Sequence, residues 1–227
     1  MAAPMANPAY VSAWWREFSE ETMADGFRAL LEAVPFSAKR PGIHSLILRA
    51  ISPAETPLFE LDLRSLPAGA VDAIAMVREQ LHSDTSLELR AWWDLWTFDL
   101  AGSRWEHGPQ PVSIFCNGED FDDCAATDTG HFFADIGFEH LFTGHAQLLS
   151  SSSHRAAPQD VTEMDFLAHM AEPAHLNEYR EKTRENVRAL LAWVAQVQKL
   201  PAVRACRVWS EGEENLEAKL DEIVALR

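Results

Sequence analysis

Residues 86–99 read SLELRAWWDLWTFD, and the alternation of their side chains predicts a long β-strand. One face of that strand is apolar throughout and consists of Leu87, Leu89, Ala91, Trp93 and Leu95. The other face begins with the polar Glu88 and Arg90 and then carries Trp92, Trp96 and Phe98. A strand with two apolar faces at one end is typical of the middle of a covered sheet. The alternative is a surface patch in which Trp92 and Trp96 contact a partner.

The segments around this strand predict an α+β fold. Further strands are expected over residues 43–51, 58–64, 112–116, 131–143 and 203–209, and the segment that leads to 112–116 is expected to be interrupted at Gly108–Pro111. Helical spacing is found over residues 8–34, with a break at Asp25-Gly26, and over 68–82, 161–170, 174–199 and 216–223. We therefore expect a mainly antiparallel sheet of about five or six strands, packed with helices that include a long C-terminal helix.

The domain organisation is expected to be simple. Residues 1–8 contain two prolines and small side chains, which predicts a flexible tail. Residues 9–227 then form a single domain, with a weak candidate boundary at 150–158, where Ser150–Ser153 form a serine run.

Charge and cysteine content restrict the classes of function. The 227 residues carry a formal net charge of −16, so nucleic acids and anionic membranes are not expected partners. Three cysteines without a CxxC pair do not predict a disulfide framework. Neither a secretory signal nor an apolar run long enough to span a membrane is recognised, so the expected location is the cytoplasm.

The charge is distributed unevenly along the chain. Residues 105–154 contain no lysine or arginine, yet they hold five of the nine histidines and two of the three cysteines. The same stretch holds eight acidic residues, which are Glu106, Glu119, Asp120, Asp122, Asp123, Asp128, Asp135 and Glu139. Such a stretch could hold a metal ion, supply a general base or form an acidic docking surface.

A calcium site is not favoured. An EF-hand loop counted from Asp120 would place Cys124 at position 5, Ala125 at position 6 and His131 at position 12, so the ligand pattern fails. A looser cation site formed by Asp120, Asp122, Asp123 and Asp128 is less expected than a solvated loop in which aspartates cap turns.

Residues 131–145, HFFADIGFEHLFTGH, suggest a transition-metal site. If residues 131–139 form one strand, one face of it carries His131, Asp135 and Glu139. His131 and Glu139 would then lie about 26 Å apart. A shared ion is therefore excluded for these three side chains. The remaining pair is His140 and His145, which would meet only if the turn at Thr143-Gly144 folds back. With a nearby carboxylate, this pair could bind a divalent metal in a metal-dependent hydrolase.

The leading hypothesis is a non-enzymatic, inhibitor-like or immunity-like protein that binds a basic partner protein. No nucleophile elbow, P-loop or dinucleotide fingerprint is present, and no cofactor is predicted. The binding surface would carry the charges of Asp120, Asp122, Asp123, Asp128 and Glu139, with Trp92 and Trp96 as aromatic anchors. The His140/His145 hydrolase is the alternative, and a homodimer through the long helix is a third hypothesis.

Overall fold

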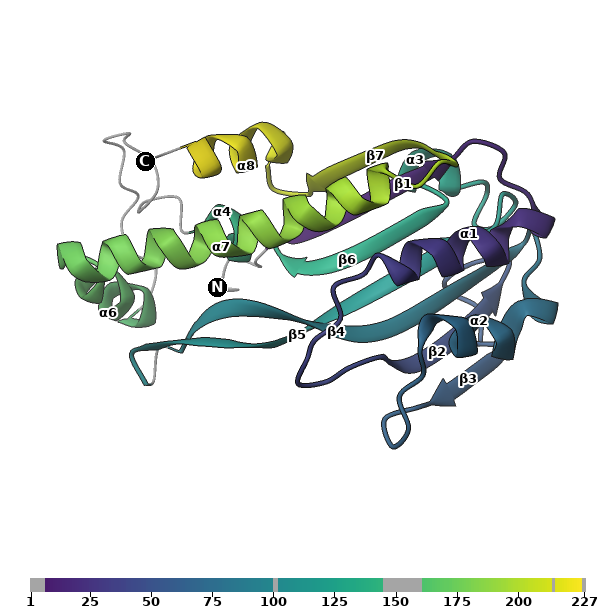
Figure 1. Ribbon diagram of the computed structural model, residues 1–227, viewed down its shortest axis with the longest axis horizontal. Helices are drawn as coiled ribbons and strands as arrows, with labels where there is room; N and C mark the ends of the chain where they lie inside the picture. The colour runs from purple at the N-terminus through teal and green to yellow at the C-terminus, as the bar shows by residue number, and fades with distance from the viewer. Residues whose placement is uncertain (1–6, 100–101, 145–160, 214, 226–227) are drawn as a thin grey trace.

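The computed structural model describes residues 7–99, 102–144, 161–213 and 215–225, and its centre is one seven-stranded sheet (Figure 1). The order is β3-β2-β4-β5-β6-β1-β7, and every pair of neighbours is antiparallel. The strands are β1 (Pro8–Trp15), β2 (Ile43–Ala50), β3 (Phe59–Asp62), β4 (Thr85–Asp99), β5 (Arg104–Asn117), β6 (Phe132–Phe138) and β7 (Val203–Ser210). The predicted α+β class and antiparallel sheet are confirmed, with more strands than the five or six expected.

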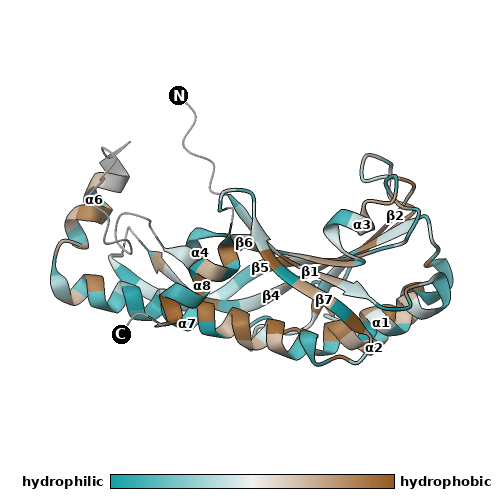
Figure 2. Ribbon diagram, turned by 90° about the horizontal axis from the view of Figure 1, so that it is seen from above, coloured by the Kyte–Doolittle hydropathy of each residue, from teal (hydrophilic) through white to brown (hydrophobic). Residues whose placement is uncertain are grey.

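The helices lie mainly on one face of the sheet. Their bounds are α1 (Glu20–Glu32), α2 (Ala70–Val77) with a 3-10 turn at Arg78–Gln80, α3 (Ala126–Thr129), α4 (His140–Thr143), α6 (Val161–His169), α7 (Pro173–Gln198) and α8 (Leu216–Ala225). Figure 2 shows α1, α2 and α7 on one side of the sheet and α3 on the other. The predicted long helix is α7, but it is not C-terminal, because β7 and α8 follow it.

β4 and β5 form the central hairpin of the sheet. The apolar face predicted for β4 is buried, with Leu87, Leu89 and Leu95 at 0% exposure. Trp93 on the same face packs edge-on against Trp193 of α7, with ring centroids 5.7 Å apart. This contact joins the long helix to the middle of the sheet.

The predicted helix over 8–34 is wrong in its first half, because Pro8–Trp15 is strand β1. Val11, Trp14 and Trp15 fit a helical spacing, but Ala9, Val11 and Ala13 also alternate, and they are buried on one face. β1 pairs with β6 on one edge and β7 on the other, so two ladders of hydrogen bonds favour the strand. The helix begins only after Ser19, whose backbone N–H donates to Thr22 Oγ1 at 2.9 Å.

The predicted interruption at Gly108–Pro111 is also wrong, because β5 continues through it. Pro109 and Pro111 pair with Asp94 and Trp92. The carbonyl of Trp92 accepts from the N–H of Ser37, which lies on the other side of β4 from β5. Trp92 and Pro111 are therefore a pair without hydrogen bonds to each other, and their backbone groups point away from the hairpin. The proline nitrogens therefore face the outer edge of β5, and β6 reaches only Ser113 to Cys116. Proline is tolerated there because no ladder bond is lost.

The predicted extended segment over 131–143 ends early. β6 stops at Phe138, and the helical turn α4 follows. Gly137 adopts φ = 91° inside the strand, between Asp135 and Phe138, where the pairing of β6 with β1 shifts register.

Residues 1–6 and 145–160 lie outside the described part of the chain, so the predicted tail and the boundary at 150–158 stay predictions. Within the described residues, no helix has the length and apolar character needed to cross a membrane.

Candidate functional site

The acidic loop, residues 117–130, connects β5 to β6 and is anchored to the neighbouring strands by its backbone. The N–H groups of Gly118 and Asp120 donate to the carbonyls of Thr85 and Ser83, both at 2.8 Å. The N–H of Asp122 donates to the carbonyl of Ile51 at 2.7 Å. The loop also buries the side chain of Phe121, which is 4% exposed. These contacts anchor the loop to the segments that flank β2 and β4.

The carboxylates of this loop face solvent. The loop acids are all exposed and consist of Glu119, Asp120, Asp122, Asp123 and Asp128. Within the described part of the chain, none of them forms an ion pair. Asp122, Asp123 and Cys124 adopt φ values of 51°, 54° and 66°. Consecutive left-handed residues without glycine are strained and persist only where their surroundings hold them.

An aromatic row lies beside the acidic loop on the same face of the sheet, and its members are Phe115, Phe133, Tyr10 and Trp209. Phe115 and Phe133 line a cavity of about 210 Å³ together with Phe121 and Asp122 of the loop. Ring centroids are 5.5 Å apart for Phe115–Phe133, 4.9 Å for Phe133–Tyr10 and 4.5 Å for Tyr10–Trp209. All four rings are partly exposed, so the row is accessible.

Two polar groups, Tyr10 within this row and Asp135 beside it, have altered acidity. Asp135 on β6 is partly buried, and its burial raises the pKa of the carboxyl group. Burial also raises the pKa of Tyr10, as does its hydrogen bond to Glu211, to which the hydroxyl donates at 3.0 Å. Both shifts favour uncharged side chains beside the aromatic row.

The structure separates Glu139 from the four loop aspartates with which it was grouped in the sequence. The loop precedes β6, whereas Glu139 follows it, so the seven residues of β6 place them about 23 Å apart. Glu139 instead accepts a hydrogen bond from Ser210 Oγ at 2.5 Å and is partly buried. It therefore does not belong to the surface formed by the loop.

Trp92 and Trp96 also lie away from the acidic loop, because both belong to the part of β4 that runs toward the hairpin tip. Each is partly buried beneath a cation: the guanidinium of Arg40 lies 4.5 Å from the Trp92 ring centroid, and Lys182 Nζ lies 3.7 Å from that of Trp96. Trp96 Nε1 also donates to Glu185 at 2.6 Å.

The candidate metal ligands do not form a described cluster. His131 Nδ1 accepts from the N–H of Trp15 at 3.0 Å, and its ring stacks on Phe18 with centroids 4.1 Å apart. Burial lowers the pKa of His131 to about 4, and the nearby Arg204 adds to the shift. His140 is exposed and stacks on Phe138, whereas His145 lies outside the described residues. In the described chain, no three His, Cys, Asp or Glu side chains are placed to hold a metal.

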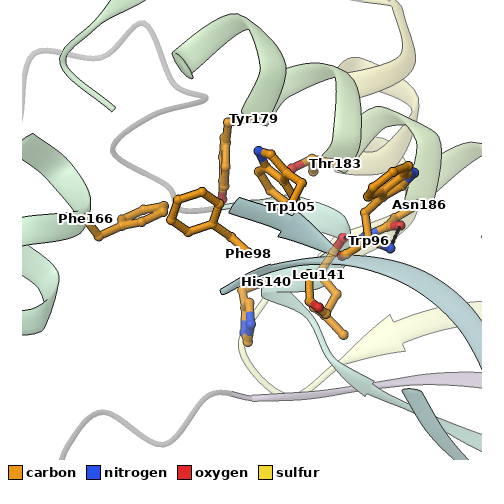
Figure 3. Close-up of a pocket in the computed structure, with 10 residues that line it drawn as sticks. Trp96, Phe98, Trp105, His140, Leu141, Phe166, Tyr179, Thr183 and Asn186 are labelled. Atoms are coloured by element: carbon orange, nitrogen blue, oxygen red, sulfur yellow. Dashed lines mark hydrogen bonds between the residues drawn. The ribbon is translucent and has the colours of Figure 1, made fainter. Parts of the chain in front are cut away.

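A second candidate site lies between the hairpin tip and α7, and we call it the hairpin cavity (Figure 3). Its volume is about 270 Å³. The lining residues used below are Phe98, Trp105, Phe166, Tyr179, Thr183 and Asn186. Figure 3 shows that the aromatic rings come from three separate parts of the chain: the hairpin, α6 and α7.

Asn186 fixes α7 against the hairpin at this cavity. It is 3% exposed, and its Oδ1 accepts from the N–H of Trp96 at 2.8 Å. Its Nδ2 donates to the carbonyls of Trp96 at 2.9 Å and Leu141 at 3.0 Å. The side-chain amide therefore pairs with the free edge of β4 as a neighbouring strand would.

No pattern in the sequence indicates the hairpin cavity. Phe98 and Tyr179 are far apart in the chain, and the helical spacing of α7 marks Tyr179 and Thr183 only as core positions. For the aromatic row a weak signal existed, because Phe133 shares one face of β6 with the polar Asp135. No protein-family model, curated protein or solved structure matches this chain.

Proposed function

We propose that this chain is a non-enzymatic protein-binding module that recognises a basic partner through the acidic loop and the adjacent aromatic row. One observation carries the proposal: five exposed carboxylates without ion pairs in the described chain lie in an anchored loop next to partly exposed rings. An inhibitor or immunity-like protein that covers a basic enzyme would use such a surface.

The anchored backbone of the loop favours binding. A loop whose backbone is held by hydrogen bonds before association loses less entropy on binding than a free loop. Its strained turn at Asp122–Cys124 presents charge at the cost of stability, which is typical of segments kept for recognition.

The two parts of the surface would play different roles. The carboxylates would increase the association rate of a basic partner, because long-range attraction steers the encounter. The rings of Phe133, Tyr10 and Trp209 would slow dissociation, because desolvated aromatic side chains dominate binding energy at protein interfaces.

The experiment uses a partner that is cross-linked in the source cells, identified, purified and then titrated by calorimetry at several salt concentrations. The test variant converts the five loop acids to the corresponding amides. The matched control converts five exposed acids elsewhere, which are Glu17, Glu32, Glu79, Asp221 and Glu222. Both variants have the same net charge, so only the position of the lost charge differs.

We expect the loop variant to lose at least about 10-fold in affinity, mainly through a slower association rate and with a weaker salt dependence. The control should stay within about 2-fold of the native protein, because screened charges far from the interface contribute little. Equal losses in both variants, or a partner that is itself acidic, would show that the acidic loop is not the binding surface.

A further inference from the structure

The hairpin cavity is lined by aromatic rings that support one another and is partly open to solvent. Phe98 packs edge-on against Trp105 and Phe166, with centroids 5.2 and 5.7 Å apart. Tyr179 contacts Trp105 and Phe166 at 5.5 and 5.7 Å. The four rings form a closed cycle, so the apolar wall is held in place independently of any ligand.

Thr183 places a polar atom in this apolar wall. The residue is 3% exposed and lines the cavity. Its hydroxyl forms no hydrogen bond to another described residue, and its oxygen is not one of the fully buried polar atoms that lack a partner, so it is accessible from the cavity. A hydroxyl that reaches the cavity in this way can donate to, or accept from, a ligand bound there. The amide of neighbouring Asn186 binds Trp96 and Leu141 instead.

The size of the cavity indicates the size of a ligand. An apolar cavity of about 150 Å³ accommodates one benzene ring. The hairpin cavity, at about 270 Å³, therefore has room for two fused rings.

The surroundings favour a neutral ligand. A neighbouring cavity of about 410 Å³ shares Trp96, Phe98 and Trp105 with the hairpin cavity. Its lining includes the cations Arg104 and Lys182 and the anion Glu178. Charges of both signs border the shared wall, so neither a cationic nor an anionic ligand is selected by electrostatic attraction.

We propose that the hairpin cavity binds a small, neutral, planar molecule of two fused rings, with one polar group that hydrogen-bonds Thr183. The rings of the ligand pack between Phe98, Trp105 and Tyr179. The hydroxyl of Thr183 selects ligands with a donor or acceptor at the ring edge. This site is separate from the acidic loop and does not depend on the proposed function.

The test compares indole with indene by calorimetry, because the two have nearly the same shape but only indole carries an N–H donor. Thr183→Val removes the hydroxyl at nearly constant volume, and Thr183→Ser keeps it. We expect sub-millimolar binding of indole to the native chain and a loss of about 5- to 10-fold in Thr183→Val, as for one hydrogen bond. Indene should bind the native and Thr183→Val chains equally, and Thr183→Ser should retain the preference for indole.

Three results would overturn the proposal. Indole does not bind the native chain up to its solubility limit, a result that depends on no variant. Thr183→Val weakens indole and indene equally, which would make the hydroxyl irrelevant to selection. Tetramethylammonium binds more tightly than indole, which would make the rings a site for cations. Thermal melting of each variant confirms that a loss of binding does not reflect unfolding.

Discussion

Replacing Asn186 with alanine should lower the free energy of unfolding by about 2.5–4 kcal/mol. The substitution removes three hydrogen bonds, to the N–H and carbonyl of Trp96 and to the carbonyl of Leu141. Each of these hydrogen bonds contributes about 1–1.5 kcal/mol to the free energy of unfolding, and the higher helix propensity of alanine offsets about 0.6 kcal/mol of the loss. In a chain of this size, the loss corresponds to a decrease in melting temperature of roughly 5–16 °C.

Urea denaturation followed by far-UV circular dichroism measures this loss. The matched control is Asn177→Ala, which makes the same change at an exposed position of α7 and should stay within about 0.5 kcal/mol of the native protein. Asn186→Asp keeps the acceptor for Trp96 N–H but loses both donors, so it should destabilise as much as alanine. A loss below about 1 kcal/mol in Asn186→Ala would refute the role of this amide as a substitute strand.

Three further substitutions test other parts of the structure. Glu88→Gln should cost about 2–3 kcal/mol in urea denaturation, because the buried Glu88 accepts from Arg49 at 3.1 Å and Arg90 at 2.7 Å and both cations would lose their charged partner. The exposed pair Arg64–Asp62 is the comparison, and Asp62→Asn should change stability much less than Glu88→Gln. His131→Asn should flatten the pH dependence of stability. The pKa of His131 is about 4 in the folded chain, so between about pH 6.5 and pH 4 the unfolded chain binds one more proton than the folded chain. The free energy of unfolding therefore falls as the pH drops through this range, by about 1–2 kcal/mol for this half-exposed ring. An identical pH dependence of the melting temperature in the native and variant chains would contradict this assignment. Cys124→Gly should raise the free energy of unfolding by about 0.5–1 kcal/mol, because glycine adopts the left-handed φ of 66° without the backbone strain that cysteine has there. A destabilised variant would mean that this turn is not strained.

Strong local patterns made much of the fold predictable. The alternation in 86–99 and the spacing over 174–199 each satisfy one period over many residues, and they correspond to β4 and α7. Residues 8–15 satisfy both periods, and only the strands on either side decide between them. Local sequence therefore predicts an element where its pattern is unambiguous, and tertiary pairing decides the remainder.

The candidate sites were less predictable, because they depend on distances in space. An ion shared by His131, Asp135 and Glu139 could be excluded from the sequence, because the rise per residue of a β-strand already places them too far apart. The separation of Glu139 from the acidic loop depends on the bounds of β6, which starts after the loop and ends at Phe138, before Glu139. The unpartnered hydroxyl of Thr183 could not be anticipated at all, because it depends on what α6 and the hairpin place around α7.

The hairpin tip is available as a cavity wall because both of its edges are protected from pairing. β2 pairs with β4 only as far as Ala91, and β6 pairs with β5 only from Ser113 onward, so the outer part of the hairpin extends beyond its neighbours (Figure 1). Exposed strand edges normally attract other strands. Here Asn186 occupies the edge of β4 at Trp96, and two prolines remove donors from the edge of β5. An extended hairpin with protected edges can therefore present Phe98 and Trp105 to α7 without becoming a site of aggregation.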